Sequence, residues 1–295
     1  MNRDLSERLE NAINSSTTLK GLAGFFKGLL VSVFHRSPLR PIKLFFNGAW
    51  LEHPLHAVLV AVPLGAWTVV IVLDLAALLF RVPNLGFASG LTLGLGTLGA
   101  LGAIVAGLMD YMDTDPPIQP VAFTHGVINI LATALFAISF FLRLGSNWAI
   151  TVEPAILSIL GYLVVTVGSY LGGHLVFRLG TMVNRNAFRA GPWEFVSVMA
   201  LKELPENQPR RVDVQGNPVL LVRRGQQVHA IGAVCSHLGG PLEAGELEGD
   251  TIECPLHNSR YSIKDGSAKA GPTTSPVPIY ETQTKNGQIQ LKMKR

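Results

Sequence analysis

Four long runs of apolar residues constrain the fold of this chain more than any other feature. They cover about residues 54–80, 85–110, 121–143 and 151–177. Each run is long enough to cross a hydrocarbon core of about 30 Å as a helix. The gaps between the runs are short, which makes consecutive helices antiparallel neighbours. We therefore predict a membrane all-α four-helix bundle over residues 50–180. A very apolar soluble bundle is the alternative, although soluble helices carry a polar face that these runs mostly lack.

The composition agrees with a chain that lies partly in lipid. Hydrophobic residues make up 48% of the 295 positions and charged residues only 15%, which is unusual for a single soluble domain. The formal net charge of +4 is mild, and the Lys and Arg residues form no basic run. We therefore expect membrane lipid, and not nucleic acid, as a partner.

Residues 1–49 precede the first run and are predicted to contain a helix that lies in the membrane surface. The stretch 18–34 combines many apolar residues with two lysines, Lys20 and Lys27, as interfacial helices do. The first 20 residues are polar and mixed in charge, so we expect no secretory signal peptide.

The sequence pattern changes at about residue 193. Short stretches of β-forming residues follow, for example 218–223, 227–231 and 289–292, and Gly, Pro, Asn and Asp residues separate them. We predict a soluble all-β domain over residues 193–295, joined to the bundle by a linker at 181–192.

Basic residues near the ends of the apolar runs predict the orientation in the membrane. Four crossings place both termini on one side, and basic residues near the runs on that side are more numerous than on the other. The terminal side has Arg36, Arg40, Lys43, Arg178, Arg185 and Arg189, against Arg81 and Arg143 on the other. The positive-inside rule then predicts that the termini and the β domain are cytoplasmic.

Two short motifs in the β domain carry the most specific chemistry. They are Cys235-Ser-His237 and Cys254-Pro-Leu-His257, and they use both cysteines of the chain. Two thiolates can hold one iron of a 2Fe–2S cluster and two imidazoles the other, which gives reduction potentials of roughly −150 to +300 mV. Two Cys and two His also suit a tetrahedral zinc ion, which is the alternative occupant.

The sequence around these motifs resembles Rieske ferredoxin-like domains across most of residues 194–293. The matching stretches are Gly239-Gly240-Pro241-Leu242 and Tyr261-Ser-Ile-Lys-Asp-Gly266. The resemblance implies a β-sandwich-like fold in which two loops hold a 2Fe–2S cluster, and it favours that cluster over zinc.

Departures from the family pattern bear on the reduction potential. Respiratory Rieske proteins join the two cluster loops by a disulfide, and its positions here are Gly240 and Leu256. Those proteins also place a serine and a tyrosine at the spacings of Ser259 and Tyr261, where the two residues hydrogen-bond the cluster and its cysteine ligand. Such bonds stabilise the reduced cluster, so we predict a potential above that of oxygenase-type ferredoxins. The alternative is that Ser259 is a loop residue and Tyr261 packs in the core.

Histidines lie at the ends of the apolar runs, and the up-and-down path places them on the cytoplasmic side. A b-type haem needs two imidazoles that face each other across the bundle, for which the candidates are His56, His125 and His174. A non-haem metal at His53 and His56, a quinone bound by a histidine and Asp110, and a structural role are the alternatives.

The bundle is also similar to an uncharacterised bacterial four-helix membrane family, over residues 50–185. The stretches that carry the resemblance include His53-Pro-Leu-His56, Thr124-His125-Gly-Val-Ile-Asn129 and Gly172-Gly-His174. Members are sometimes fused to Rieske domains. The resemblance implies a multi-pass protein of the bacterial inner (cytoplasmic) membrane and says little about chemistry.

One acidic residue, Asp74, lies far along the first run. At helical rise it is about 27 Å from His56, near the opposite membrane face. We expect an interfacial aspartate that Arg81 is close enough to pair with, the alternative being a proton or quinone group.

These features together predict an electron-transfer protein. We expect it to pass electrons between a cytoplasmic redox partner and a haem or quinone site in the bundle. The alternative is a redox-sensing or interaction module that the helices only anchor. We find no nucleophile constellation, phosphate loop or mononuclear iron triad, so no catalytic residue is assigned and membership among the oxidoreductases stays open.

Overall fold

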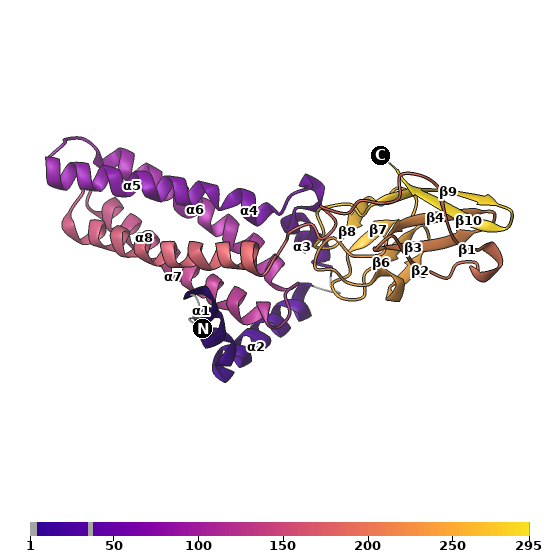
Figure 1. Cartoon of the computed structure of the whole chain (residues 1–295). Coiled ribbons are helices and arrows are strands. Elements are labelled where there is room, and N and C mark those ends of the chain that lie inside the picture. The colour runs from indigo at the N-terminus through magenta and orange to yellow at the C-terminus, as the bar shows by residue number, and fades with distance from the viewer. Residues whose placement is uncertain (1–4, 35–37, 295) are drawn as a thin grey trace. The chain divides into compact units, whose positions relative to one another are not determined.

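The computed structural model describes residues 5–34 and 38–294. Arg36, which entered the comparison of basic residues, lies outside the described residues. The chain divides into two compact units, Met1–Phe46 with Leu55–Gly180, and Asn47–Pro54 with Thr181–Arg295. The first unit is helical and the second consists mainly of β-strands (Figure 1).

The helical unit contains the predicted four-helix bundle. Its long helices are α5 (Ala61–Phe80), α6 (Gly86–Tyr111), α7 (Ile118–Gly145) and α8 (Val152–Gly173), and α8 continues into a π-helical turn at His174–Arg178. Shorter or earlier helices are α1 (Leu5–Ser15), α2 (Thr17–Phe34), α3 (Arg40–Asn47) and α4 (Leu55–Leu59). The break between α4 and α5 falls four residues before Pro63, whose ring would clash with the carbonyl of Leu59 in a continuous helix.

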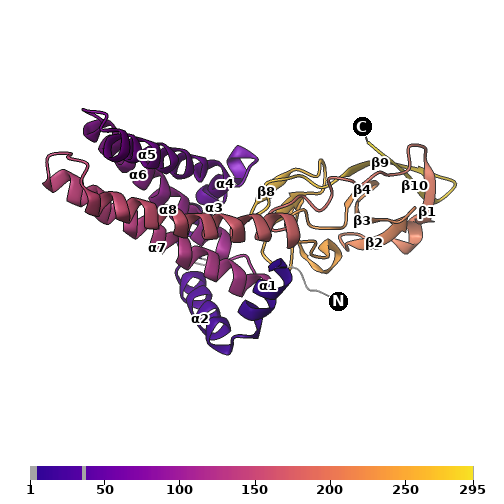
Figure 2. The same ribbon diagram turned by 60° about the vertical axis from the view of Figure 1, so that its left-hand side comes forward.

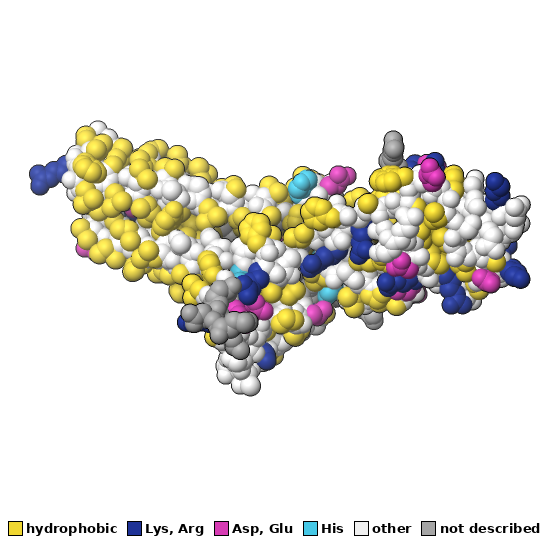
Figure 3. Space-filling model, viewed as in Figure 1, with side chains coloured by type: hydrophobic (Ala, Val, Ile, Leu, Met, Phe, Trp, Pro, Cys, Tyr) yellow, Lys and Arg dark blue, Asp and Glu magenta, His cyan; other side chains and the backbone are white. Residues whose placement is uncertain are grey.

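Among the described residues, five stretches, one more than predicted, are long and apolar enough to cross a membrane. Four are Leu55–Phe80, Gly86–Tyr111, Ile118–Gly145 and Val152–Arg178, and the fifth is α2. Hydrophobic side chains cover the visible face of α5–α8 in Figure 3. Large apolar residues such as Phe80 and Phe141 are exposed there, at 77% and 66%, as expected of a surface that faces lipid.

The N-terminal helices lie outside the bundle, with α1 and α2 against α7 (Figures 1 and 2). Lys27 in α2 bonds to the carbonyl of Thr114 at 2.6 Å and to the carboxylate of Asp115 at 2.7 Å, in the connection between α6 and α7. Tyr111 donates a hydrogen bond to the carbonyl of Ala23 at 2.6 Å. The polar contacts of α2 are therefore at one end of the bundle.

The centre of the bundle depends on small residues that admit one large ring. Trp67 in α5 is buried and stacks on Phe136 in α7, with ring centroids 4.0 Å apart. A Cβ atom on Gly96 of α6 would lie 2.9 Å from the Trp67 ring. Glycine at this position therefore lets α6 approach α5 closely.

Near the far end of α5, Asp74 and Arg143 form an ion pair that is fully buried. One guanidinium nitrogen of Arg143 is 2.7 Å from Oδ1 of Asp74, and a second bonds to Oδ2. Three serine hydroxyls complete the network, with bonds of 2.8 Å or more to these two side chains; they belong to Ser89, Ser139 and Ser158. Residues from all four helices therefore meet at one polar site.

The expectation for Asp74 was wrong in two respects. Asp74 is 0% exposed, whereas an interfacial residue was expected, and its partner is Arg143 in α7 and not the exposed Arg81. A carboxylate so buried must be paired, because desolvating an isolated charge is very costly. The bidentate guanidinium supplies that pairing.

The β unit contains two antiparallel sheets. The larger has the strand order β1-β10-β9-β4-β3-β2 and the smaller the order β5-β6-β7-β8. The strands are β1 (Val196–Ala200), β2 (Arg210–Val214), β3 (Asn217–Arg224), β4 (Gln227–Gly232), β5 (Glu246–Glu248), β6 (Thr251–Glu253), β7 (Arg260–Ser262), β8 (Ala268–Ala270), β9 (Ile279–Lys285) and β10 (Gln288–Met293). The unit also contains the single-turn helices Ala49–Leu51, Leu201–Glu203 and Leu242–Ala244.

Strand β3 separates two hydrophobic cores, because successive side chains of a strand point to opposite faces. Leu220 and Val222 pack in the core that contains the cysteines and Tyr261. Val219 and Leu221 pack in the other core. The small sheet covers the first core, so the loops at its end rest on a packed base.

We predict that breaking the buried ion pair destabilises the bundle. Arg143→Met should lower the free energy of unfolding by about 3–5 kcal/mol, because it leaves the Asp74 carboxylate buried without its partner. The double variant Asp74→Leu/Arg143→Met should recover much of that loss. Thermal unfolding of the full chain in detergent measures both. Arg81→Gln is the control, and an equal loss from that variant would contradict the assignment.

Candidate metal centre

The first predicted motif forms a closed loop after β4. The amide of Cys235 donates to the carbonyl of Gly240 at 2.9 Å, and the amide of Gly239 donates to the carbonyl of Cys235 at 3.0 Å. Gly239 has φ +81°, a left-handed conformation that glycine adopts without strain. These two bonds turn the chain back on itself and present His237 from the middle of the loop.

The second motif repeats this construction between β6 and β7. The amide of Cys254 donates to the carbonyl of Ser259 at 2.8 Å, and the amide of Asn258 donates to the carbonyl of Cys254 at 3.1 Å. Asn258, with φ +60°, occupies the position that Gly239 has in the first loop. Asparagine is one of the few other residues that tolerate this conformation. His257 lies within the loop, one position later than its counterpart.

The four predicted ligands come together as two separate pairs. The Cys235 and Cys254 thiols contact each other, and the rings of His237 and His257 are 5.0 Å apart between centroids, with their planes at 88°. All four side chains are buried. Across residues 5–34 and 38–294, no three His, Cys, Asp or Glu side chains converge where one metal ion could bind them. The grouping into two pairs is the one that a two-iron cluster needs, with one pair of ligands for each iron.

The histidine pair has the spacing that one metal ion requires. With a metal–nitrogen bond of about 2.0–2.1 Å and a ring nitrogen roughly 1.15 Å from its ring centre, two imidazoles at a tetrahedral angle have centres roughly 5.2 Å apart. The observed 5.0 Å agrees. One iron at the cysteine pair and one at the histidine pair is the arrangement of a Rieske cluster, and the residues present fit it.

Gly240 allows the two loops to approach. A Cβ atom at this position would lie 2.6 Å from Sγ of Cys254 and 3.1 Å from the side chain of Leu256. Gly240 and Leu256 therefore do face each other, at the two positions where respiratory relatives carry a disulfide. Here a close glycine contact takes the place of that covalent bond.

Two hydroxyl groups lie beside the cysteine sulfurs. The Tyr261 hydroxyl is 3.2 Å from Sγ of Cys235 and accepts a hydrogen bond from the amide of Ser236 at 3.0 Å. Because the amide donates, the hydroxyl proton is left for the sulfur. The Ser259 hydroxyl is fully buried, it helps to lower the pKa of the Cys235 thiol, and it makes no hydrogen bond to a nitrogen or oxygen among the described residues. A buried hydroxyl needs an acceptor, and a sulfur atom of the cluster would provide it.

The sulfur environment favours one thiolate. The neighbouring Cys254 thiol, aided by Tyr261, lowers the pKa of the Cys235 thiol to about 6. The same contact and burial raise the pKa of Cys254. Burial and the adjacent Cys235 raise the pKa of Tyr261, so its hydroxyl stays protonated and able to donate.

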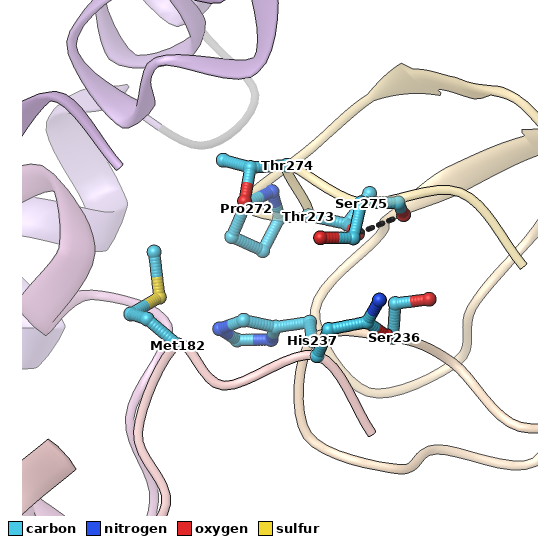
Figure 4. A pocket seen from close by; sticks show the side chains of 8 residues that line it. Met182, Ser236, His237, Pro272, Thr273, Thr274 and Ser275 are labelled. Carbon is cyan, nitrogen blue, oxygen red and sulfur yellow. Dashed lines mark hydrogen bonds between the residues drawn. The ribbon is translucent and has the colours of Figure 1, made fainter. Parts of the chain in front are cut away.

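Residues expected in a linker support the first loop. Asn186 belongs to the β unit and is buried; its side-chain amide donates to the carbonyl of Val234 at 2.8 Å and to the Ser236 hydroxyl at 2.9 Å. His237 borders a small pocket whose other walls include Met182 and residues 272–275 (Figure 4). Sequence reasoning missed Asn186, since an isolated asparagine carries no motif.

Of the four histidines at the ends of the apolar runs, two lie next to each other and two have other neighbours. The rings of His56 and His125 are neighbours, with centroids 6.3 Å apart and planes at 89°. The ring of His174 is buried and contacts the carboxylate of Glu10 in α1 at 3.2 Å. His53 is exposed, and its Nδ1 lies 3.2 Å from the carbonyl of Leu51. The structure therefore brings together two of the three haem candidates.

Comparison with protein families assigns both parts of the chain. Residues 194–281 match the Rieske 2Fe-2S domain, and residues 52–185 match the family described as predicted membrane protein (DUF2231). Both predicted resemblances are confirmed.

Individual relatives match the β unit. The ferredoxin subunit of anthranilate 1,2-dioxygenase from Burkholderia cepacia is 32% identical over 31% of this chain and 85% of its own length. The ferredoxin subunit of 3-phenylpropionate/cinnamic acid dioxygenase from Escherichia coli O139:H28 is 36% identical over 30% of this chain and 82% of its own length. Among solved structures, the ferredoxin of carbazole 1,9a-dioxygenase from Nocardioides aromaticivorans IC177 is 34% identical, with a TM-score of 0.33 over 34% of this chain and 98% of that one.

The chain therefore belongs to the Rieske 2Fe–2S family through its C-terminal domain, which is fused to a membrane domain of the DUF2231 family. Its cofactor is a Rieske-type 2Fe–2S cluster, and its chemistry is electron transfer.

We predict that Gly240→Ala loses most of its cluster, because the added methyl group would displace the Cys254 sulfur. Gly239→Asn is the matched control in the same loop: a Cβ atom there meets nothing within 4 Å, and asparagine already occupies the equivalent position 258. Iron and acid-labile sulfide per chain measure the effect. Full iron content in Gly240→Ala would show that the close approach is not needed.

We also predict that Ser259→Ala and Tyr261→Phe lower the reduction potential. Each removes one hydrogen bond to sulfur, and a difference of about 1–1.4 kcal/mol corresponds to roughly 40–60 mV for one electron. An EPR-monitored redox titration of the full chain measures the shift. If neither variant has a lower reduction potential than the wild type, the two hydroxyls do not set the potential.

Proposed function

We propose that this protein is a membrane-anchored Rieske electron-transfer protein, which passes electrons between a cytoplasmic redox partner and a haem or quinone site in its bundle. The observation that carries the proposal is the division of the four ligand residues into a cysteine pair and a histidine pair. That division fits a two-iron cluster, with one pair of ligands for each iron.

In this proposal each ligand residue has a defined task. Cys235 and Cys254 hold one iron as thiolates, and His237 and His257 hold the other as imidazoles. When bound, the cluster exchanges single electrons. Tyr261 and Ser259 donate hydrogen bonds toward sulfur, where negative charge increases on reduction. The paired loop bonds keep the ligands in place in both oxidation states.

Several observations support a membrane anchor with its termini in the bacterial cytoplasm. The helical unit presents large exposed apolar side chains along α5–α8. Among the basic residues compared, Arg143 on the far side is neutralised by Asp74 and Lys43 on the terminal side by Asp113, both in buried pairs. Arg81 is exposed on the far side, and Arg178 and Arg185 are exposed on the terminal side. The asymmetry of accessible positive charge favours a cytoplasmic terminal side.

The named relatives suggest the class of partner. They are ferredoxin components of dioxygenase systems, and we propose that this β unit likewise docks with another redox protein. In this proposal the partner protein carries out any substrate chemistry.

The test uses membranes from cells that express the full chain. Wild-type membranes should give the EPR signal of a reduced Rieske cluster, with two irons per purified chain, and Cys254→Ser should lose both. The purified protein should also contain a second redox group, either haem in its optical spectrum or quinone in its lipid extract. Cys254→Ser should retain that group, because the bundle is a separate unit.

Two results would contradict the proposal. Zinc in place of iron would remove the electron-transfer function altogether. An intact cluster without haem or quinone would leave the helices as an anchor and favour a redox-sensing or interaction module.

A further inference from the structure

The helical unit contains the same local arrangement twice, and the first copy surrounds His56. Nδ1 of His56, in α4, lies 2.8 Å from the carbonyl oxygen of Ala103 in α6. One turn further along α6, a Cβ atom on Gly107 would be 3.0 Å from Cε1 of the same ring. The imidazole is therefore held by a backbone carbonyl and lies against a position where only glycine leaves room.

The second copy surrounds His125 and uses the other helical hairpin. Nδ1 of His125, in α7, lies 2.9 Å from the carbonyl oxygen of Gly168 in α8. One turn further along α8, a Cβ atom on Gly172 would again be 3.0 Å from Cε1 of the ring. Each hairpin thus contributes one histidine from its first half, and a carbonyl of its second long helix, α6 or α8, fixes the ring in the same way.

This arrangement selects one tautomer for both rings. A carbonyl oxygen only accepts, so Nδ1 of each histidine carries the proton and Nε2 carries the lone pair. An Nδ1–H bond to a backbone carbonyl is the usual support of a metal-bound histidine. The side-chain amide nitrogen of Asn129 lies 3.2 Å from Nδ1 and 3.5 Å from Nε2 of His125, and it donates a hydrogen bond to the backbone carbonyl of His125 at 2.8 Å. The Gly168 carbonyl oxygen, at 2.9 Å, is therefore the closer partner of Nδ1.

The distance between the rings fits two imidazoles on opposite sides of one metal ion. With the bond lengths used for the cluster pair, opposed imidazoles have ring centres roughly 6.4 Å apart. The observed separation of His56 and His125 is 6.3 Å, against 5.0 Å for His237 and His257. The ring planes are at nearly the same angle in the two pairs, 89° and 88°, so the pairs differ in separation. The larger separation is the one that opposed ligands require.

Two imidazoles alone do not hold a bare metal ion well. No third His, Cys, Asp or Glu side chain joins this pair in the described parts of the chain. Haem supplies four nitrogen ligands of its own and needs only two axial ligands from the protein. Gly107 and Gly172 leave room for the two imidazole rings themselves, and a Cβ atom on Gly126, next to His125, would meet nothing within 4 Å.

We propose that His56 and His125 are the axial ligands of a b-type haem, bound through Nε2 of each ring. The proposal rests on the function proposed above and names the redox group of its membrane site. It excludes His174, whose ring contacts Glu10, and the exposed His53.

The test uses the full chain, produced in cells supplied with the haem precursor δ-aminolevulinate and purified in detergent. The wild type should contain about one haem per chain, with a low-spin ferric spectrum and sharp α and β bands after dithionite reduction. His56→Ala and His125→Ala should each either lose the low-spin spectrum or contain at least tenfold less haem per chain than the wild type. Added imidazole should restore the low-spin spectrum in haemin-loaded samples, which separates a lost ligand from a misfolded chain. The matched controls His174→Ala and His53→Ala should keep the wild-type spectrum.

Three results would overturn the assignment. They are a wild type that binds no haem even when haemin is added, a wild-type spectrum retained in both His56→Ala and His125→Ala, and loss of the spectrum in His174→Ala alone. The Rieske EPR signal is recorded on the same samples. A cluster without haem refutes only this assignment, whereas a missing cluster refutes the proposed function.

Discussion

The backbone hydrogen bonds that close the two cysteine loops are the constraint on which the metal centre depends. In each loop the cysteine amide and carbonyl are both bonded within the loop, so the thiol and the following histidine project from a fixed frame. Both loops rest on the core that contains Tyr261 and the central strand β3. The fold therefore holds two sulfurs and two imidazoles in place as two pairs, which lowers the cost of organising the site.

In the apolar helical unit, each buried polar group likewise needs a partner that is held in place. Asp74 and Arg143 pair with each other, and a serine of each neighbouring helix, Ser89 of α6 and Ser158 of α8, hydrogen-bonds to the pair. At the other end of the bundle, backbone carbonyls fix the rings of His56 and His125. Because unsatisfied groups are especially costly in lipid, these contacts limit the ways in which the four helices can pack.

Local patterns predicted much of this structure, and distant contacts account for what they missed. The apolar runs, the change to β structure near residue 193 and the two Cys–His motifs depend on neighbouring residues, so the sequence alone reveals them. The partner of Asp74 lies 69 positions away, and the nearer Arg81 was the only candidate that local spacing could offer. The separation of His56 and His125 from His174 likewise depends on carbonyls and a glutamate supplied by other helices. No local pattern encodes such packing.

The central claim is that the two cysteines hold one iron and the two histidines the other. The Mössbauer spectrum of the full chain, enriched in 57Fe and reduced by one electron, tests it most directly. Two distinct iron sites, a ferric site with sulfur ligands and a ferrous site with nitrogen ligands, are the predicted result. Two sites with the same all-sulfur ligation, or a protein that takes up no iron, would contradict the account.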